Sequence, residues 1–342
     1  MIRKSTLFAI VMGLLVAGCG AGQQEREASS NATVGIVATT TQVADMARNV
    51  GGDGVEVTGL LTANADPHDY EVRPQDIEAL SSAELVVRSG GDIDEWLTEA
   101  IEGSGTEAPL VNLIDHVRTI EGGAHGDGDQ DAHGEEEGHA DGEEANAEEE
   151  ANADGEEGVD PHWWQDPQNA QRAVSEIRDA LTAADPAGRQ TYARNADAYL
   201  SQLRGLDAGI EDCMRRVPED QRKLVTTHDS LGYYANRYGL EVIGTVIPSL
   251  SSQGQPSAGE TQKLIKTIEH EHVKAIFTER AVNPKVERAI AEETDARIEA
   301  LWADTLGPQD SDASTYLDAL AADTRVLVDG FTGGEVACTL PS

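Results

Sequence analysis

Residues 34–52 read VGIVATTTQVADMARNVGG and contain the structural unit that the rest of the chain repeats. The apolar run at residues 34–38 predicts a strand. Apolar side chains then recur at helical spacing before a glycine pair: Val43, Met46, Ala47, Val50 and Gly51-Gly52. A strand, a helix and a glycine stop form the unit from which parallel sheets are built.

The same unit recurs along the chain, which has 342 residues and is long enough for two domains. In the first half we predict strands at residues 55–61, 85–87 and 110–114, and helices beginning near Pro74 and around Trp96. In the second half we predict strands at residues 224–227, 240–247, 273–278 and 298–302, and helices at 231–238, 257–270, 284–293 and 311–324. The alternation predicts an α/β fold with two lobes, each a mostly parallel sheet flanked by helices.

A long helical region separates the two halves. Residues 166–213 carry apolar side chains at helical spacing, interrupted near Pro186. A position between two α/β halves favours a rigid connector over a core helix of one domain. We therefore expect an N-terminal lobe at residues 33–185, one long connecting helix at 186–216 and a C-terminal lobe at 217–342.

Residues 122–158 interrupt the N-terminal lobe with a different composition. They include no Lys, Arg, aromatic or large aliphatic residue, and three histidines stand among the small, acidic and amide residues: His125, His133 and His139. This composition cannot bury enough apolar surface to fold, so it predicts a disordered acidic loop. Two interpretations stay open: a solvated insertion, or an accessory site that gathers divalent ions weakly.

The N-terminus has the features of a secretory signal. Arg3 and Lys4 precede an apolar stretch that is shorter than the ~20 residues needed to span a bilayer. The quartet VAGC at residues 16–19 resembles a bacterial lipobox, which implies cleavage after residue 18 and a lipid on Cys19. We expect residues 19–32 to be a flexible leash that anchors the protein outside the cytoplasm, in the periplasm or on the outer face of the cell membrane.

The remaining cysteines favour a disulfide. If Cys19 carries a lipid, Cys213 and Cys338 are left as a pair in an oxidising compartment. Closing so long a loop contributes about 4 kcal/mol to stability in the chain-entropy model.

The net charge of −38 restricts the partners of this protein. Nucleic acids and anionic membrane surfaces would be repelled, whereas cations would be attracted. The sequence contains no Walker motif, so ATP hydrolysis by this chain is not expected.

Two Asp-Pro-His turns suggest two parts of one site. The first lies in NADPHDYE at residues 64–71, and the second in DPHW at residues 160–163. Proline restricts the backbone before His68 and His162, and imidazole is a common metal ligand. Either turn alone would be interpreted as an ordinary surface turn. His228 and Asp304 follow the carboxyl ends of predicted strands, where open parallel sheets bind ligands.

Four motifs resemble, in order, the signatures of one family: NADPHDYEVRPQDIEAL, DPHWWQDP, THDSLGYYANRYGLEV and ALWADTLGP. These are signatures of the zinc and manganese solute-binding lipoproteins of bacterial ABC transporters, and the similarity covers nearly the whole mature chain. The resemblance implies two α/β lobes joined by one long rigid helix. It also implies a metal held between the lobes by His68, His162, His228 and Asp304.

The resemblance further implies the identity of the metal and the partners. Three imidazoles and one carboxylate suit four-coordinate Zn²⁺, and manganese-binding members carry a glutamate where this chain has His228. The acidic His-rich insertion resembles the loop of zinc-binding members. We therefore expect a monomer that is not an enzyme, transports Zn²⁺ in preference to Mn²⁺, and delivers it to a permease served by a separate ATPase.

Several residues near the expected ligands could orient them. The aspartates that could hold the imidazoles, or could simply form turns, are Asp66, Asp69, Asp160 and Asp229. Glu279 ends a strand near the cleft and could perturb the site, but it is not expected to be a ligand. Trp163 and Trp164 are expected to pack beside His162.

Two alternatives remain open. A secreted zinc hydrolase could use three histidines and keep a fourth position for water, although no HExxH motif or general base is evident and Asp304 would close that position. Within the binding class, the chain could be a manganese or iron homologue, or a surface adhesin of the same fold.

Overall fold

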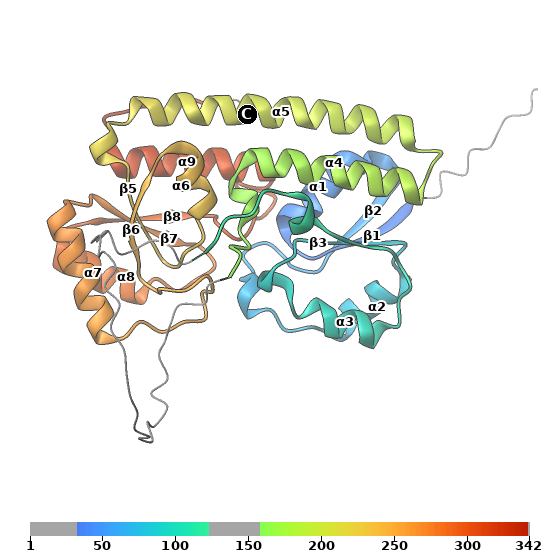
Figure 1. The fold of residues 1–342 in the computed structure, drawn as a ribbon, viewed down its shortest axis with the longest axis horizontal. Helices are drawn as coiled ribbons and strands as arrows, with labels where there is room; N and C mark the ends of the chain where they lie inside the picture. Colours follow the sequence, from blue (N-terminus) through green and yellow to red (C-terminus); the bar gives the residue numbers. More distant parts are fainter. Residues whose placement is uncertain (1–32, 123–157, 341–342) are drawn as a thin grey trace, which may run out of the picture. The chain divides into compact units, whose positions relative to one another are not determined.

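The computed structural model describes residues 33–122 and 158–340 (Figure 1). These residues form two four-stranded sheets in which all paired strands run parallel, with helices on both sides. The predicted two-lobe α/β fold is therefore confirmed. Four predictions lie outside the described residues: the signal at 1–18, the leash at 19–32, the lipid on Cys19, and the loop histidines His125, His133 and His139.

The first sheet has the strand order β2-β1-β3-β4. Its strands are β1 (Val34–Ala38), β2 (Val55–Gly59), β3 (Leu85–Arg88) and β4 (Leu110–Asn112), and its helices are α1 (Thr41–Gly51), α2 (Pro74–Ser82) and α3 (Leu97–Ser104). Neighbouring residues of β1 enter different cores: Ile36 packs in the cluster that contains α1, and Val37 in the cluster that contains α2 and α3. Burial on both faces explains why this strand is an unbroken apolar run.

The second sheet repeats this arrangement with the order β6-β5-β7-β8. Its strands are β5 (Lys223–Thr226), β6 (Glu241–Thr245), β7 (Ala275–Glu279) and β8 (Arg297–Leu301), and its helices are α6 (Gly232–Tyr238), α7 (Ala258–Glu271), α8 (Lys285–Thr294) and α9 (Tyr316–Thr332). In β7, Ile276 packs with α7 and α8, whereas Phe277 packs against Phe331 of α9 with ring centroids 5.3 Å apart.

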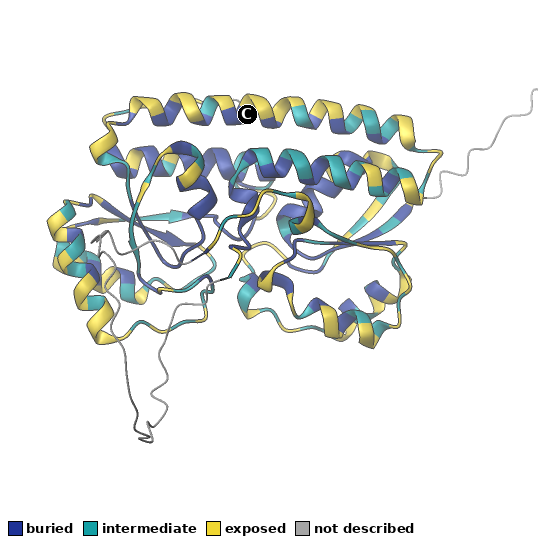
Figure 2. Cartoon of the chain, viewed as in Figure 1, coloured by how far each residue is buried: buried dark blue, intermediate teal, exposed yellow. Residues whose placement is uncertain are grey.

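Two long helices, α4 (Pro167–Ala184) and α5 (Arg189–Arg216), connect the sheets. α5 has 28 residues and is about 42 Å long at 1.5 Å per residue. It contacts α4, α1 of the first lobe and α9 of the second, and Figure 2 shows exposed residues along its outer side. Of the helices in residues 33–122 and 158–340, none is long and apolar enough to cross a bilayer.

Polar contacts also attach α5 to both lobes. The Tyr199 hydroxyl donates to the carboxylate of Asp45 in α1 over 3.2 Å. Toward its other end, the Asp207 carboxylate accepts hydrogen bonds from Arg237 and Tyr238 of α6, at 2.8 and 2.9 Å. The helix therefore acts as a strut that is fixed to each lobe.

The last helix begins and ends later than predicted. The sequence predicts residues 311–324, whereas α9 spans Tyr316–Thr332. Thr315 caps the helix by accepting the backbone N–H of Asp318, and the preceding residues form a turn in which Gly307 N–H donates to the Ala313 carbonyl. Ser311 and Thr315 are both good caps by residue type, so spacing alone does not choose between them.

A disulfide joins Cys213, in the last turn of α5, to Cys338 in the segment that follows α9. The two residues are 125 positions apart in the sequence. The bridge is the pairing expected from the cysteine count, and it attaches the end of the strut to the C-terminal part of the second lobe.

Replacing both cysteines with alanine should lower the free energy of unfolding by about 3–5 kcal/mol, because the unfolded chain would no longer contain a closed loop of this length. Urea denaturation of the mature chain measures the loss. Reductant should destabilise the wild type and leave the Cys213→Ala/Cys338→Ala variant unchanged. Equal midpoints for the oxidised wild type and the variant would contradict the prediction.

Candidate metal centre

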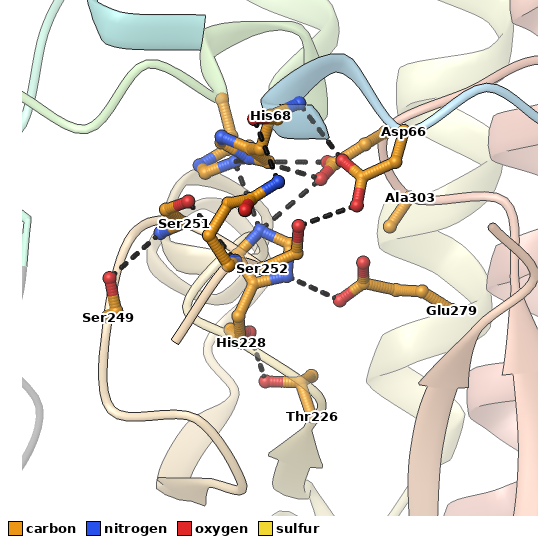
Figure 3. Close-up of polar contacts among 12 residues, drawn as sticks. Asp66, His68, Thr226, His228, Ser249, Ser251, Ser252, Glu279 and Ala303 are labelled. Carbon is orange, nitrogen blue, oxygen red and sulfur yellow. Dashed lines mark hydrogen bonds and ion pairs between the residues drawn. The ribbon is translucent and has the colours of Figure 1, made fainter. Parts of the chain in front are cut away.

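Four side chains from separate segments converge between the lobes (Figure 3). Each offers one ligand atom, and these atoms all lie within 4.8 Å of one another: His68, His162, His228 and Asp304. His68 follows β2 and His162 precedes α4, whereas His228 and Asp304 follow the ends of β5 and β8. The side chains are at most 4% exposed. The structure thus brings together the four residues singled out in the sequence.

The two Asp-Pro-His turns share one local construction. In the first, the Asp66 carboxylate accepts the backbone N–H of His68 at 2.9 Å. In the second, the Asp160 carboxylate accepts the backbone N–H of His162 at 2.8 Å. Because the intervening proline also fixes φ, each turn sets the direction of its histidine before any ligand arrives.

The segment that carries Asp304 is held from the first lobe. The carbonyl of Ala303 accepts hydrogen bonds from the Trp164 indole N–H at 3.0 Å and from the Gln165 amide at 2.8 Å. Trp164 also lies beside His162, with ring centroids 5.4 Å apart, as predicted. These contacts place the peptide before Asp304 against the first lobe.

Buried carboxyl groups fix the orientation of two imidazoles. His162 Nδ1 lies 2.8 Å from an Asp160 oxygen, and His228 Nδ1 lies 2.7 Å from a Glu279 oxygen. A proton on Nδ1 in each ring leaves the Nε2 lone pair free to bind a metal. Thr226 adds a backbone contact, because its hydroxyl donates to the His228 carbonyl at 2.7 Å.

The predicted orienting partners are only partly confirmed. Asp160 contacts an imidazole, whereas Asp66 binds the His68 backbone and Asp69 closes the same turn through its own N–H. The backbone N–H of Asp229 donates to the Ser249 carbonyl. The orienting role of Glu279 is not predicted from the sequence. Its position at the end of β7, the neighbour of β5, was the available signal.

The geometry fits one four-coordinate cation. Atoms placed tetrahedrally about 2.0–2.1 Å from a zinc ion are about 3.3–3.4 Å apart. The Nε2 atom of His162 lies 3.4 Å from those of His68 and His228, and Asp304 oxygens lie 3.2–3.8 Å from the three imidazoles. Within the described residues, neither buried oxygen of Asp304 has a hydrogen-bond partner. A cation would satisfy both the spacing and these oxygens.

Without a metal, neighbouring carboxylates favour the protonated form of two imidazoles. Burial lowers the pKa of His162 and of His228, but nearby carboxylates outweigh it, so both pKa values are raised. Those carboxylates are chiefly Asp304 and Asp160 for His162, and Glu279 and Asp304 for His228. Burial raises the pKa of Asp304, but the imidazoles outweigh it and hold that pKa well below its usual range. An incoming metal must therefore displace protons.

Comparison with known proteins identifies similar chains. The family profile described as "Zinc-uptake complex component A periplasmic" matches residues 36–330. The manganese-binding lipoprotein MntA of Halalkalibacterium halodurans is 27% identical, over 94% of this chain and 96% of that protein. The high-affinity zinc uptake system protein ZnuA of Bacillus subtilis is 31% identical, over 96% and 98%.

A solved structure supports the fold. The periplasmic zinc binding protein TroA from Treponema pallidum aligns with a TM-score of 0.71 and 23% identity, over 86% of this chain and 98% of that one. The two proteins therefore share the two-lobe fold.

Changing Glu279 to glutamine should weaken metal affinity about 10–100-fold, because the carboxyl group that orients His228 is lost while the side chain keeps its size. Titration against a chelating dye measures the change. Glu102→Gln, at an exposed position of α3, is the matched control and should bind as the wild type does. An unchanged affinity for Glu279→Gln would show that the contact does not support the site.

Metal affinity should fall as the pH is lowered, beginning above pH 6.5. The sign follows from the raised pKa values of His162 and His228, because protons and metal compete for the same imidazoles. Asp304 stays ionised over this range because its pKa is lowered. At least one proton displaced per metal gives about a tenfold loss per pH unit. Calorimetry in buffers of different ionisation enthalpy counts the protons, and a pH-independent affinity would contradict the prediction.

Proposed function

The chain belongs to the family of periplasmic zinc-uptake complex component A, and we propose that the metal it carries is Zn²⁺. As a member of this family, it is a substrate-binding protein of a metal ABC transporter and not an enzyme. Relatives in this family are named for zinc and for manganese, so membership does not choose the metal. The choice rests on the donor atoms of this chain.

The observation that carries the proposal is the third imidazole. His228 lies among the proposed ligands with its Nε2 3.4 Å from that of His162 and 3.2 Å from an Asp304 oxygen. Three nitrogen donors and one oxygen donor suit zinc in a four-coordinate site. Manganese prefers a larger share of oxygen ligands. A carboxylate in place of His228 would move the set toward manganese.

Capture and release follow from the division of the ligands between the lobes. His68 and His162 belong to the first lobe, and His228 and Asp304 to the second, so a bound ion joins the two. Separating the lobes would divide the donor set and free the ion. We propose that this happens at a membrane permease, with ATP hydrolysed by a separate subunit and the binding protein acting as a monomer.

The N-terminal segments complete the proposal. Cleavage after residue 18 and a lipid on Cys19 would keep the protein at the outer face of the membrane or in the periplasm.

The three histidines His125, His133 and His139 would supply weak accessory sites for Zn²⁺.

A soluble chain without residues 1–18 and with Cys19→Ser tests the metal assignment. After dialysis against equal Zn²⁺ and Mn²⁺, the wild type should retain one Zn²⁺ per chain by elemental analysis. His228→Ala should lose more affinity than the about 10–100-fold expected for an orienting partner. His228→Glu should shift the preference toward Mn²⁺.

Two controls separate the outcomes. His270→Ala removes an imidazole that is 85% exposed and should change nothing. Deletion of residues 123–157 should remove weak sites and keep the tight one. Retention of Mn²⁺ by the wild type, or unaltered Zn²⁺ binding by His228→Ala, would overturn the zinc assignment and favour the manganese alternative.

A further inference from the structure

The turn that carries His68 is held differently from the other ligand segments. The rings of His162 and His228 are each fixed through Nδ1 by a buried carboxyl group. Among the described contacts, the ring of His68 meets only the other three proposed ligands, including Asp304 at 3.6 Å. The position of His68 therefore depends on the contacts of its backbone.

Residues 248–254, between β6 and α7, supply those contacts, and we call this segment the strap. The Ser252 hydroxyl donates to the Asp66 carboxylate at 2.6 Å, and the Gln253 amide donates to the His68 carbonyl at 3.1 Å (Figure 3). The other oxygen of Asp66 accepts the His68 N–H. The strap of the second lobe thus holds the His68 turn of the first lobe on two sides.

The other end of the strap is attached beside His228. The Ser249 carbonyl accepts the backbone N–H of Asp229, the residue after His228, at 3.0 Å. Within the strap, Ser249 and Ser251 hydroxyls accept the backbone N–H groups of Ser251 and Gln253, at 3.0 and 3.3 Å. These serine turns keep the strap in one shape. The strap therefore connects the segments of two ligands from different lobes.

We propose that the strap positions His68 and sets the rate at which bound metal leaves the site. One ligand must detach before a four-coordinate ion can leave, and within the part of the chain that the structure describes, the ring of His68 has no hydrogen-bond or ion-pair partner outside the set. Withdrawal of the turn that carries His68 requires the Ser252 and Gln253 hydrogen bonds to break, and the first of these is a contact to a carboxylate, a strong type. Ser252 and Gln253 contact the turn and not the ion. The proposal rests on the proposed zinc site only for the choice of ion.

Release into excess chelator, followed by stopped flow, tests the strap. Ser252→Ala should release Zn²⁺ about tenfold faster or more, because a hydrogen bond to a charged group is lost. Gln253→Ala should accelerate release less, since its bond is to a neutral carbonyl at an exposed position. Ser252→Thr keeps the hydroxyl and should restore slow release.

The matched control is Ser81→Ala in α2, whose hydroxyl binds a carbonyl of its own helix. It should release metal at the wild-type rate. Release from Ser252→Ala within twofold of the wild type would overturn the proposal. Equal acceleration in Ser81→Ala would overturn it as well, because the effect would then reflect general destabilisation.

The strap can also be tested without metal, which separates it from the zinc assignment. In the metal-free protein, Ser252→Ala should raise amide hydrogen exchange in the peptide that spans residues 62–70, and Ser252→Thr should not. Unchanged exchange would overturn the role of the strap even if Zn²⁺ binds. If the wild type retains no Zn²⁺ but Ser252→Ala still raises the exchange of residues 62–70, only the zinc assignment is overturned.

Discussion

A buried carboxylate requires a positive charge beside it, and Asp304 sets this requirement at the centre of the structure. Three imidazole nitrogens surround it, and two of those rings are fixed from behind by carboxyl groups. The sheets and the long helix hold these side chains in place. Parallel sheets bring the ends of β5 and β8 together, and the strut α5 contacts both lobes.

The sequence predicts most of the fold and the proposed ligands, because both depend on local signals. Strands such as β1 are short apolar runs, and the helices after them have apolar spacing and glycine or capping signals. His68 and His162 stand in Asp-Pro-His turns whose geometry is set within three residues. His228 and Asp304 follow predicted strands, whose carboxyl ends parallel topology places at one edge of a sheet, but their assignment as ligands came from the resemblance to a known family.

The contacts that the sequence does not predict join residues far apart in the chain. Glu279 reaches His228 across 51 positions, and Ser252 reaches Asp66 across 186. A glutamate at a strand end and a serine in a loop are common, so neither residue type shows its partner. The predicted start of α9 was wrong for a different reason. Ser311 and Thr315 are equally good caps by residue type, and the helix begins after Thr315.

The disulfide at the end of α5 has a consequence for the life history of the protein. For a chain that the proposed function places outside the cytoplasm, this bond can form only after translocation, where the environment is oxidising. Before export, the newly made polypeptide lacks the covalent link and is easier to keep unfolded for passage through a secretion channel. The stability contributed by the disulfide is thus gained only after export, and a chain retained in the cytoplasm would be more susceptible to proteases there.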